Sequence, residues 1–242
     1  MLKKKEPSPF SKISFAWDIH WKCNYRCPYC WWHGRWEEVE KRSIYPGWKI
    51  LSDHWKRIGG RYGEVHVEIN GGEPFIYPDF GKFLDRFLNF HTAGIMTNLS
   101  SSADLVLSGL SEKKKGRVKI GASFHPLFSD FEEFLKRAKR VKDAGVALGV
   151  LYLSYPPQIR KIPEYKKRFE EEGINFSVST FWGEYEGKSY PQSYTPEELF
   201  LIDPVLGERS GKKFQTEPLV TKGKMCRAGH TYGIIHPDGE VV

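Results

Sequence analysis

Three cysteines lie within eight residues, in the segment CNYRCPYC at 23–30. The C-x3-C-x2-C spacing of Cys23, Cys27 and Cys30 lets three thiolates converge on one cluster from a single short loop. Pro28 favours a turn over a helix there. Iron–sulfur clusters are normally held by four thiolates. Three thiolates on a [4Fe–4S] cube leave one iron with an open position, as catalytic zinc sites with three protein ligands do. The sequence therefore predicts a cluster that can bind a substrate or cosubstrate.

A zinc site is the alternative interpretation of the same residues. C-x2-C is a common zinc knuckle, and the fourth ligand could be His20, His33 or His54. A structural zinc site usually pairs two such knuckles, however, and the only further cysteine in the sequence is the distant Cys226. Clustered cysteines of this kind indicate metal ligands in a reducing compartment rather than a disulfide framework.

A second motif, Asn70–Gly71–Gly72–Glu73–Pro74, follows the second apolar run of the chain. Its two glycines stand where the backbone must turn sharply or approach a ligand closely, and a carboxylate follows them directly. Taken alone, such a turn after a strand more often reflects ordinary loop chemistry than a ligand site.

Together, the cysteine triad and the GGEP segment resemble the signature of the radical S-adenosylmethionine (radical SAM) family. In that family C-x3-C-x2-C follows the first strand and GGEP the second. The resemblance covers residues 13–182 and implies an α/β fold, a partial (β/α)6 TIM-type barrel. It also implies an oxidoreductase or maturase-type enzyme with two cofactors, a [4Fe–4S] cluster and S-adenosyl-L-methionine. Reductive cleavage of the latter gives a 5′-deoxyadenosyl radical that takes hydrogen from a substrate.

The resemblance also carries roles to individual residues. The three cysteines become the cluster ligands, and the open iron takes the amino and carboxylate groups of S-adenosylmethionine. Tyr29 occupies the position whose aromatic side chain packs by the adenine. Gly71–Pro74 would receive the methionine amino group, with Glu73 as an acceptor. Asn98 and Ser123 match positions of polar cofactor contacts more loosely, and each could equally cap a strand or a helix.

Apolar runs of strand type alternate with amphipathic stretches through most of the chain, which predicts βαβ units that place these motifs at strand ends. The predicted strands are Ile13–Ile19, Glu64–Asn70, Gly94–Leu99, Val118–Phe124, Val146–Leu153 and Ile174–Phe181. The predicted helices are Pro46–Ile58, Pro78–Phe90, Ala103–Leu110, Ser129–Ala144, Ile159–Glu172 and Pro196–Leu206. Pro78 and Pro196 suit a first helical turn, and Gly94, Gly145 and Gly173 suit helix C-caps.

Three regions follow from this pattern: an N-terminal tail at 1–12, the barrel at 13–182, and an extension at 183–242. The extension has too few apolar positions to fold alone, so we expect it to pack on the barrel.

Cys226 lies in MCRAGHTYGIIHPDGEVV, which resembles the start of a SPASM or twitch auxiliary-cluster domain. The next cysteine of that pattern would fall beyond Val242, and one cysteine cannot hold a cluster. We therefore expect an auxiliary iron–sulfur cluster only if the chain natively extends further, which we favour because the apolar strand Glu240–Val242 would otherwise lack its hairpin partner. Alternatively, Cys226 is a lone buried thiol.

Charge and hydrophobicity limit the kinds of partner that this chain is expected to bind. The net charge is +7, but the basic runs do not interleave with stacking aromatics, so nucleic acid is an unlikely partner. The first residues, MLKKKEPSPF, lack the apolar core of a signal peptide, and no apolar run is long enough to span a membrane, so we expect a cytoplasmic protein without a membrane partner.

The substrate is open at this stage. SPASM and twitch relatives often modify peptides or proteins, so we favour such a substrate, with a tRNA base or small metabolite in cofactor biosynthesis as the alternative. A reducing partner such as flavodoxin or ferredoxin is implied. A noncatalytic iron–sulfur protein for electron transfer or scaffolding, and a zinc-dependent nucleic-acid module, are the competing classes. The aromatic run Trp31–Trp36 could wall the pocket or pack the loop, and His20, His66 and His125 are more typical of core or loop histidines than of pocket residues.

Overall fold

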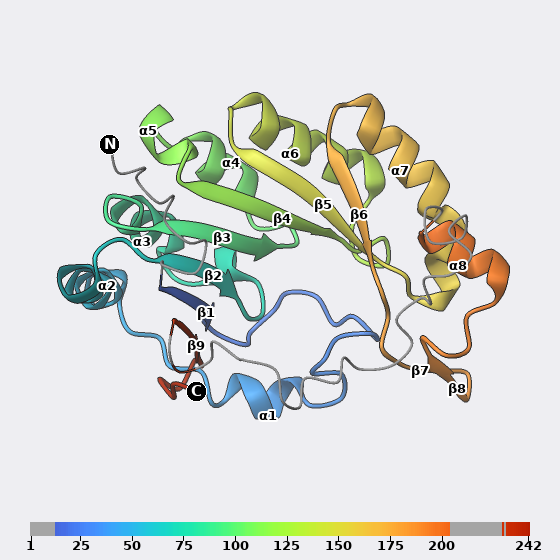
Figure 1. Cartoon of the computed structure of the whole chain (residues 1–242), viewed down its shortest axis with the longest axis horizontal. Helices are drawn as coiled ribbons and strands as arrows, with labels where there is room; N and C mark the ends of the chain where they lie inside the picture. The colour runs from blue at the N-terminus through green and yellow to red at the C-terminus, as the bar shows by residue number, and fades with distance from the viewer. Residues whose placement is uncertain (1–12, 204–228, 230) are drawn as a thin grey trace, which may run out of the picture.

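Seven strands form one sheet in the computed structural model, which describes residues 13–203, 229 and 231–242 (Figure 1). The sheet order is β6-β5-β4-β3-β2-β1-β9, and neighbouring strands are parallel throughout. The strands are β1 (Ser14–Asp18), β2 (His66–Asn70), β3 (Thr92–Thr97), β4 (Val118–Phe124), β5 (Ala147–Leu153), β6 (Asn175–Ser179) and β9 (Tyr232–Ile235). One parallel sheet with helices between its strands confirms the expected α/β fold. Because the sheet does not close into a full ring, it also agrees with the expected partial TIM-type barrel.

Helices follow the strands along the chain and pack mainly on one side of the sheet. They are α1 (Trp36–Glu40), α2 (Trp48–Tyr62), α3 (Phe80–Phe87), α4 (Ala103–Ser108), α5 (Glu112–Lys115), α6 (Phe131–Asp143), α7 (Ile162–Glu171) and α8 (Pro196–Ile202). The described residues also contain two short 3-10 turns, η1 (Pro74–Ile76) and η2 (Pro156–Lys161). They further contain an antiparallel hairpin of β7 (Gly183–Tyr185) and β8 (Lys188–Tyr190). Figure 1 shows α4, α6 and α7 on one side of the sheet, and α1 with the loop before it on the other.

The core accounts for much of the aromatic surplus. Trp17 of β1 packs on Trp55 of α2 and on Phe83 of α3, with ring centroids 5.4 and 5.5 Å apart. A second group centres on Phe124 of β4, whose ring lies 4.9 Å from Phe134 of α6. These contacts hold the helices against the strands that carry the predicted site.

Local signals in the sequence identified most helix ends. Gly145 and Gly173, at φ +86° and +62°, each stand one residue after the C-cap of α6 and α7. Pro196 is the first residue of α8, which is preceded by a capping box formed by Thr195. Gly94, however, is not a C-cap.

Gly94 lies inside β3, where a Cβ would overlap the carboxylate of Glu68 on β2. The prediction for Pro78 is wrong as well, because α3 begins at Phe80 with Asp79 as its N-cap. Gly94 thus lies in the sheet and Pro78 in the loop before α3, although both residue types are common at helix ends.

The C-terminal extension joins the barrel sheet directly. β9 pairs in parallel with β1, with Ser14 opposite Tyr232, and Figure 1 shows the two strands side by side. The last residues then fold back on β9: Ile234 and Val242 exchange two backbone hydrogen bonds of 2.8 and 3.0 Å. The expectation that Glu240–Val242 lacks a hairpin partner is therefore wrong. Cys226 and the tail at 1–12 lie outside the described residues.

Among the described residues, the helices are all too short or too polar to cross a membrane.

Candidate cofactor site

A cavity of about 380 Å³ lies at the C-terminal ends of the strands. This is the edge where parallel α/β sheets and barrels bind their ligands. Its lining includes all three motif cysteines, Tyr29, Gly71, Gly72, Glu73, Asn98 and Ser123. The structure thus brings together every predicted site residue within its described part except Pro74, which is buried as the first residue of η1.

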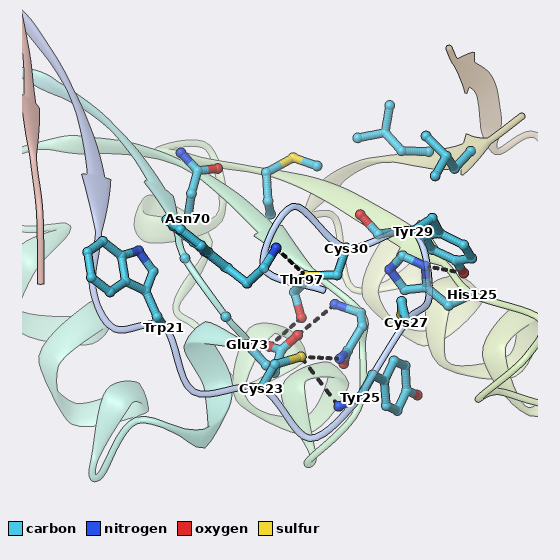
Figure 2. A pocket seen from close by; sticks show the side chains of 18 of the residues that line it. Trp21, Cys23, Tyr25, Cys27, Tyr29, Cys30, Asn70, Glu73, Thr97 and His125 are labelled. Carbon is cyan, nitrogen blue, oxygen red and sulfur yellow. Dashed lines mark hydrogen bonds between the residues drawn. The ribbon is translucent and has the colours of Figure 1, made fainter. Parts of the chain in front are cut away.

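The cysteines follow β1 on one curved loop (Figure 2). A turn closes between the backbone N–H of Cys30 and the carbonyl of Cys27 at 3.0 Å. Two of the sulfurs accept backbone N–H groups at 3.4 Å, Cys23 from Tyr25 and Cys30 from Trp32. Such donors are typical of thiolates that ligate iron–sulfur clusters.

The protein environment by itself disfavours thiolates here. Burial raises the pKa of Cys23, and it raises the pKa of Cys27 to about 12. A buried thiolate therefore needs positive charge beside it, which bound metal supplies. In the described part of the chain, no three His, Cys, Asp or Glu side chains are placed to hold one metal ion. Three thiols that line one cavity are the donor set that an iron–sulfur cluster uses, with each thiolate on a different iron.

The GGEP turn docks on the cysteine loop, backbone to backbone. The N–H of Gly72 donates to the carbonyl of His20 at 2.7 Å, and the N–H of Glu73 donates to Lys22 at 3.0 Å. Gly71 has a φ of +115°, and a Cβ on either glycine would overlap the carbonyl oxygen of His20 or Lys22. The two glycines are therefore needed for close approach to the chain's own loop, a reason that the motif alone does not reveal.

The carboxylate of Glu73 is fully buried and accepts three hydrogen bonds. The N–H of Phe75 and the hydroxyl of Thr97 donate to Oε1 at 3.0 and 2.8 Å, and the N–H of Asn98 donates to Oε2 at 2.7 Å. Burial raises the pKa of Glu73 to about 7, although the three donors oppose that shift. Its observed contacts are thus structural: they join the GGEP turn to the end of β3.

Asn98 connects this turn to the first cysteine. Its amide Nδ2 lies 3.1 Å from Oδ1 of Asn24 and 3.9 Å from Sγ of Cys23. Its Oδ1 accepts the N–H of Ser100 at 2.9 Å, while Nδ2 of Asn24 donates to the Ser100 hydroxyl, also at 2.9 Å. Nothing in the sequence pattern indicated Asn24 or Ser100, because their roles depend on contacts between segments far apart in the chain.

Tyr29 packs at the other end of the cysteine loop. Its ring stacks on His125 at 5.7 Å and lies 4.9 Å from Tyr155, and its hydroxyl pairs with His125 Nδ1 at 3.0 Å. Burial lowers the pKa of His125 to about 4, so this histidine is neutral near pH 7. His125 thus lines the cavity, contrary to the expectation of an ordinary core or loop histidine.

His20 and His66 fit that expectation better. His20 is buried, its Nε2 pairs with the Glu73 carbonyl at 3.0 Å, and burial lowers its pKa to about 4. His66 pairs with Glu68 and Thr92 within the sheet and does not line the cavity.

The aromatic run after the cysteines divides between cavity and surface. Trp32 and Trp36 line the cavity, whereas Trp31 is 86% exposed. Several lining residues were missed by sequence reasoning because apolar or small residues at strand ends carry no distinctive signal: Met96, Leu151, Leu153 and Ser179.

Comparison with known proteins supports the fold. No family model and no curated protein matches the chain. Among solved structures, SuiB of Streptococcus suis bound to S-adenosylmethionine superposes with a TM-score of 0.64 at 18% identity, covering 96% of this chain and 60% of that one. SuiB bound to the precursor peptide SuiA gives 0.64 and 17%, with coverage of 96% and 59%.

A further similar structure is anSMEcpe with bound AdoMet and the Kp18Cys peptide, at a TM-score of 0.59 and 20% identity over 78% of this chain and 57% of that one. The chain thus spans about 60% of the length of SuiB. At these identities the similarity is one of fold.

Proposed function

We propose that this chain is a radical S-adenosylmethionine enzyme, with a [4Fe–4S] cluster on Cys23, Cys27 and Cys30 and S-adenosylmethionine in the adjoining cavity. The observation that carries the proposal is the docking of the GGEP turn on the cysteine loop, with both motifs facing one cavity. Two motifs distant in sequence thereby form one site. That SuiB and anSMEcpe have been solved with S-adenosylmethionine on the same fold supports this assignment.

The chemistry of the bound cofactors is reductive cleavage of a carbon–sulfur bond to give a carbon radical. The chain's own residues hold and shield these groups. The thiolates bind the cluster, and the Gly71–Gly72 turn lets the GGEP segment lie directly against the loop that carries them. Ser123 offers a polar contact to the cosubstrate, whereas the side-chain amide of Asn98 is engaged by Ser100, Asn24 and Cys23. Trp32 and Trp36 exclude water from one side.

We further propose that the substrate is a peptide or protein. SuiB is known with its precursor peptide, and anSMEcpe with bound peptides, on this fold. The cavity has an apolar wall of Met96, Leu151 and Leu153, which suits a side chain carried in by a peptide. A small electron carrier such as flavodoxin or ferredoxin would supply the electron. Modification of a tRNA base or a small metabolite is the competing outcome.

The first test is cofactor cleavage. The protein is reconstituted anaerobically with iron and sulfide, reduced with dithionite in the presence of S-adenosylmethionine, and assayed by chromatography for 5′-deoxyadenosine. We expect product from the wild type and none from Cys27→Ala. Circular dichroism and urea unfolding of both proteins show whether the variant retains its fold.

Two results would contradict the proposal. Metal analysis that finds zinc without iron or sulfide would establish the zinc alternative. An intact cluster that yields no 5′-deoxyadenosine would indicate a noncatalytic iron–sulfur protein.

A further inference from the structure

A chain of side-chain amides connects solvent to the first motif cysteine. Asn24 is exposed on the cysteine loop, and Asn98 is buried at 6% exposure after β3. The amide of Asn98 lies between Oδ1 of Asn24 and Sγ of Cys23. The C-x3-C-x2-C motif gives Asn24 no role, because Asn24 occupies one of the positions that the motif leaves unspecified.

The surrounding hydrogen bonds determine the orientation of the Asn98 amide. Oδ1 accepts the backbone N–H of Ser100, so a flipped amide would set two donors against each other. The backbone N–H of Asn98 is used by the Glu73 carboxylate. Only Nδ2 therefore points toward Asn24 and Cys23, and both of its donor hydrogens have an acceptor there.

We propose that Asn98 donates to the Cys23 thiolate to raise the reduction potential of the cluster, and that Asn24 is a positioning residue that holds the Asn98 amide in place. This inference rests on the proposed function. A donor aimed at a ligand sulfur stabilises the more negative, reduced cluster, because it offsets charge that the ligand gains on reduction. Asn24 contributes through Oδ1, and its own Nδ2 is held by the hydroxyl of Ser100.

The experiment is a redox titration of the reconstituted protein without S-adenosylmethionine, followed by electron paramagnetic resonance of the reduced cluster. It compares the wild type with Asn98→Ala, Asn24→Ala and the double variant. Asn89→Ala is the matched control, since Asn89 is an exposed amide beyond α3 that does not line the cavity.

We expect a more negative potential in Asn98→Ala and a smaller shift in the same direction in Asn24→Ala. The double variant should match Asn98→Ala, since Asn24 acts only through Asn98. The control should titrate like the wild type.

An Asn98→Ala potential equal to that of the wild type overturns the inference, as does a double variant in which the two shifts simply add. If Asn98→Ala does not take up a cluster, Asn24→Ala decides, because the Asn24 side chain is exposed and its removal is expected to leave the fold intact. An unchanged potential in Asn24→Ala would then reject the role. A wild type that binds no cluster at all would instead refute the proposed function, and this inference with it.

Discussion

The carboxylate of Glu73 lies 2.7 Å from the backbone nitrogen of Asn98 and thereby ties the GGEP turn after β2 to the loop after β3. The same turn is tied by its own backbone to the segment that leads into Cys23. Three loops from neighbouring strands are thus held together around one buried carboxylate. This arrangement makes Glu73 a structural centre of the site, whether or not it also contacts a cofactor.

Glu73→Gln should destabilise the protein although the two side chains have the same shape. All three partners of the carboxylate are donors, so a glutamine would turn its own NH₂ group toward one of them. We expect a loss of about 1–3 kcal/mol in the free energy of unfolding, measured by urea denaturation. The control is Glu184→Gln on β7, an exposed carboxylate, with an expected change within about 0.5 kcal/mol. Equal changes in the two variants would contradict the structural role.

Gly72→Ala should prevent cluster assembly. The new methyl group would overlap the carbonyl of Lys22, which is backbone and cannot swing away, so the GGEP turn must separate from the cysteine loop. We expect iron content after reconstitution to fall several-fold.

Gly60→Ala is the control for that substitution, because a Cβ there meets nothing within 4 Å and the residue lies in α2. It should load normally and gain up to about 1 kcal/mol of stability. Normal iron loading of Gly72→Ala would refute the close approach that the structure shows.

His91 should make the stability of the fold depend on pH. This buried ring accepts the N–H of Val65 at Nδ1, 3.2 Å, and donates from Nε2 to Trp55 O, 2.8 Å, which requires the neutral form. Burial lowers its pKa below the ordinary value of 6.5. His91 therefore binds a proton more readily in the unfolded chain than in the folded one. The stability that the neutral ring contributes above about pH 6.5 is lost as the pH falls below that value.

The measurement is urea unfolding at several pH values between about 7 and 5, for the wild type and for His91→Gln. The wild type should lose up to about 1.4 kcal/mol more per pH unit than the variant. The comparison isolates His91 from the other buried histidines. Parallel pH curves for the two proteins would show that His91 does not titrate in this way.

Tyr29 offers a way to separate ring packing from hydrogen bonding. Tyr29→Phe keeps the ring beside His125 and Tyr155 but removes the hydroxyl contact to His125, at a cost of about 0.5–1.5 kcal/mol in stability. If the ring packs by the adenine, Tyr29→Phe retains the affinity of the cluster-loaded protein for S-adenosylmethionine, measured by equilibrium dialysis, and Tyr29→Ala loses it. Equal affinities in the phenylalanine and alanine variants would reject that contact.

The sequence predicted the six barrel strands to within a few residues, because each is an apolar run bounded by turn residues. It also placed the cysteine triad and the GGEP turn at one edge of the sheet, since parallel strands present their C-terminal ends together.

What it did not predict depends on contacts between distant segments. Whether Gly94 ends a helix or lies in a strand beside Glu68 is decided by the neighbouring strand. Gly72 is required by its close approach to the carbonyl of Lys22, and Asn24 takes its role from the hydrogen bond with Asn98. Strand β9 was missed as a member of the sheet because YGII is too short to indicate a parallel partner more than 200 residues earlier.

The position of β1 between β2 and β9 has a consequence for biosynthesis. The strand that leads into the cysteine loop gains its second neighbour only when residues 232–235 have been made, which at ordinary rates of translation is on the order of ten seconds or more after the cysteines emerge. During that interval β1 has only β2 as a neighbouring strand. If the proposed cluster needs β1 held on both sides, ribosome-bound chains arrested before residue 232 should incorporate iron less well than chains that have passed residue 235.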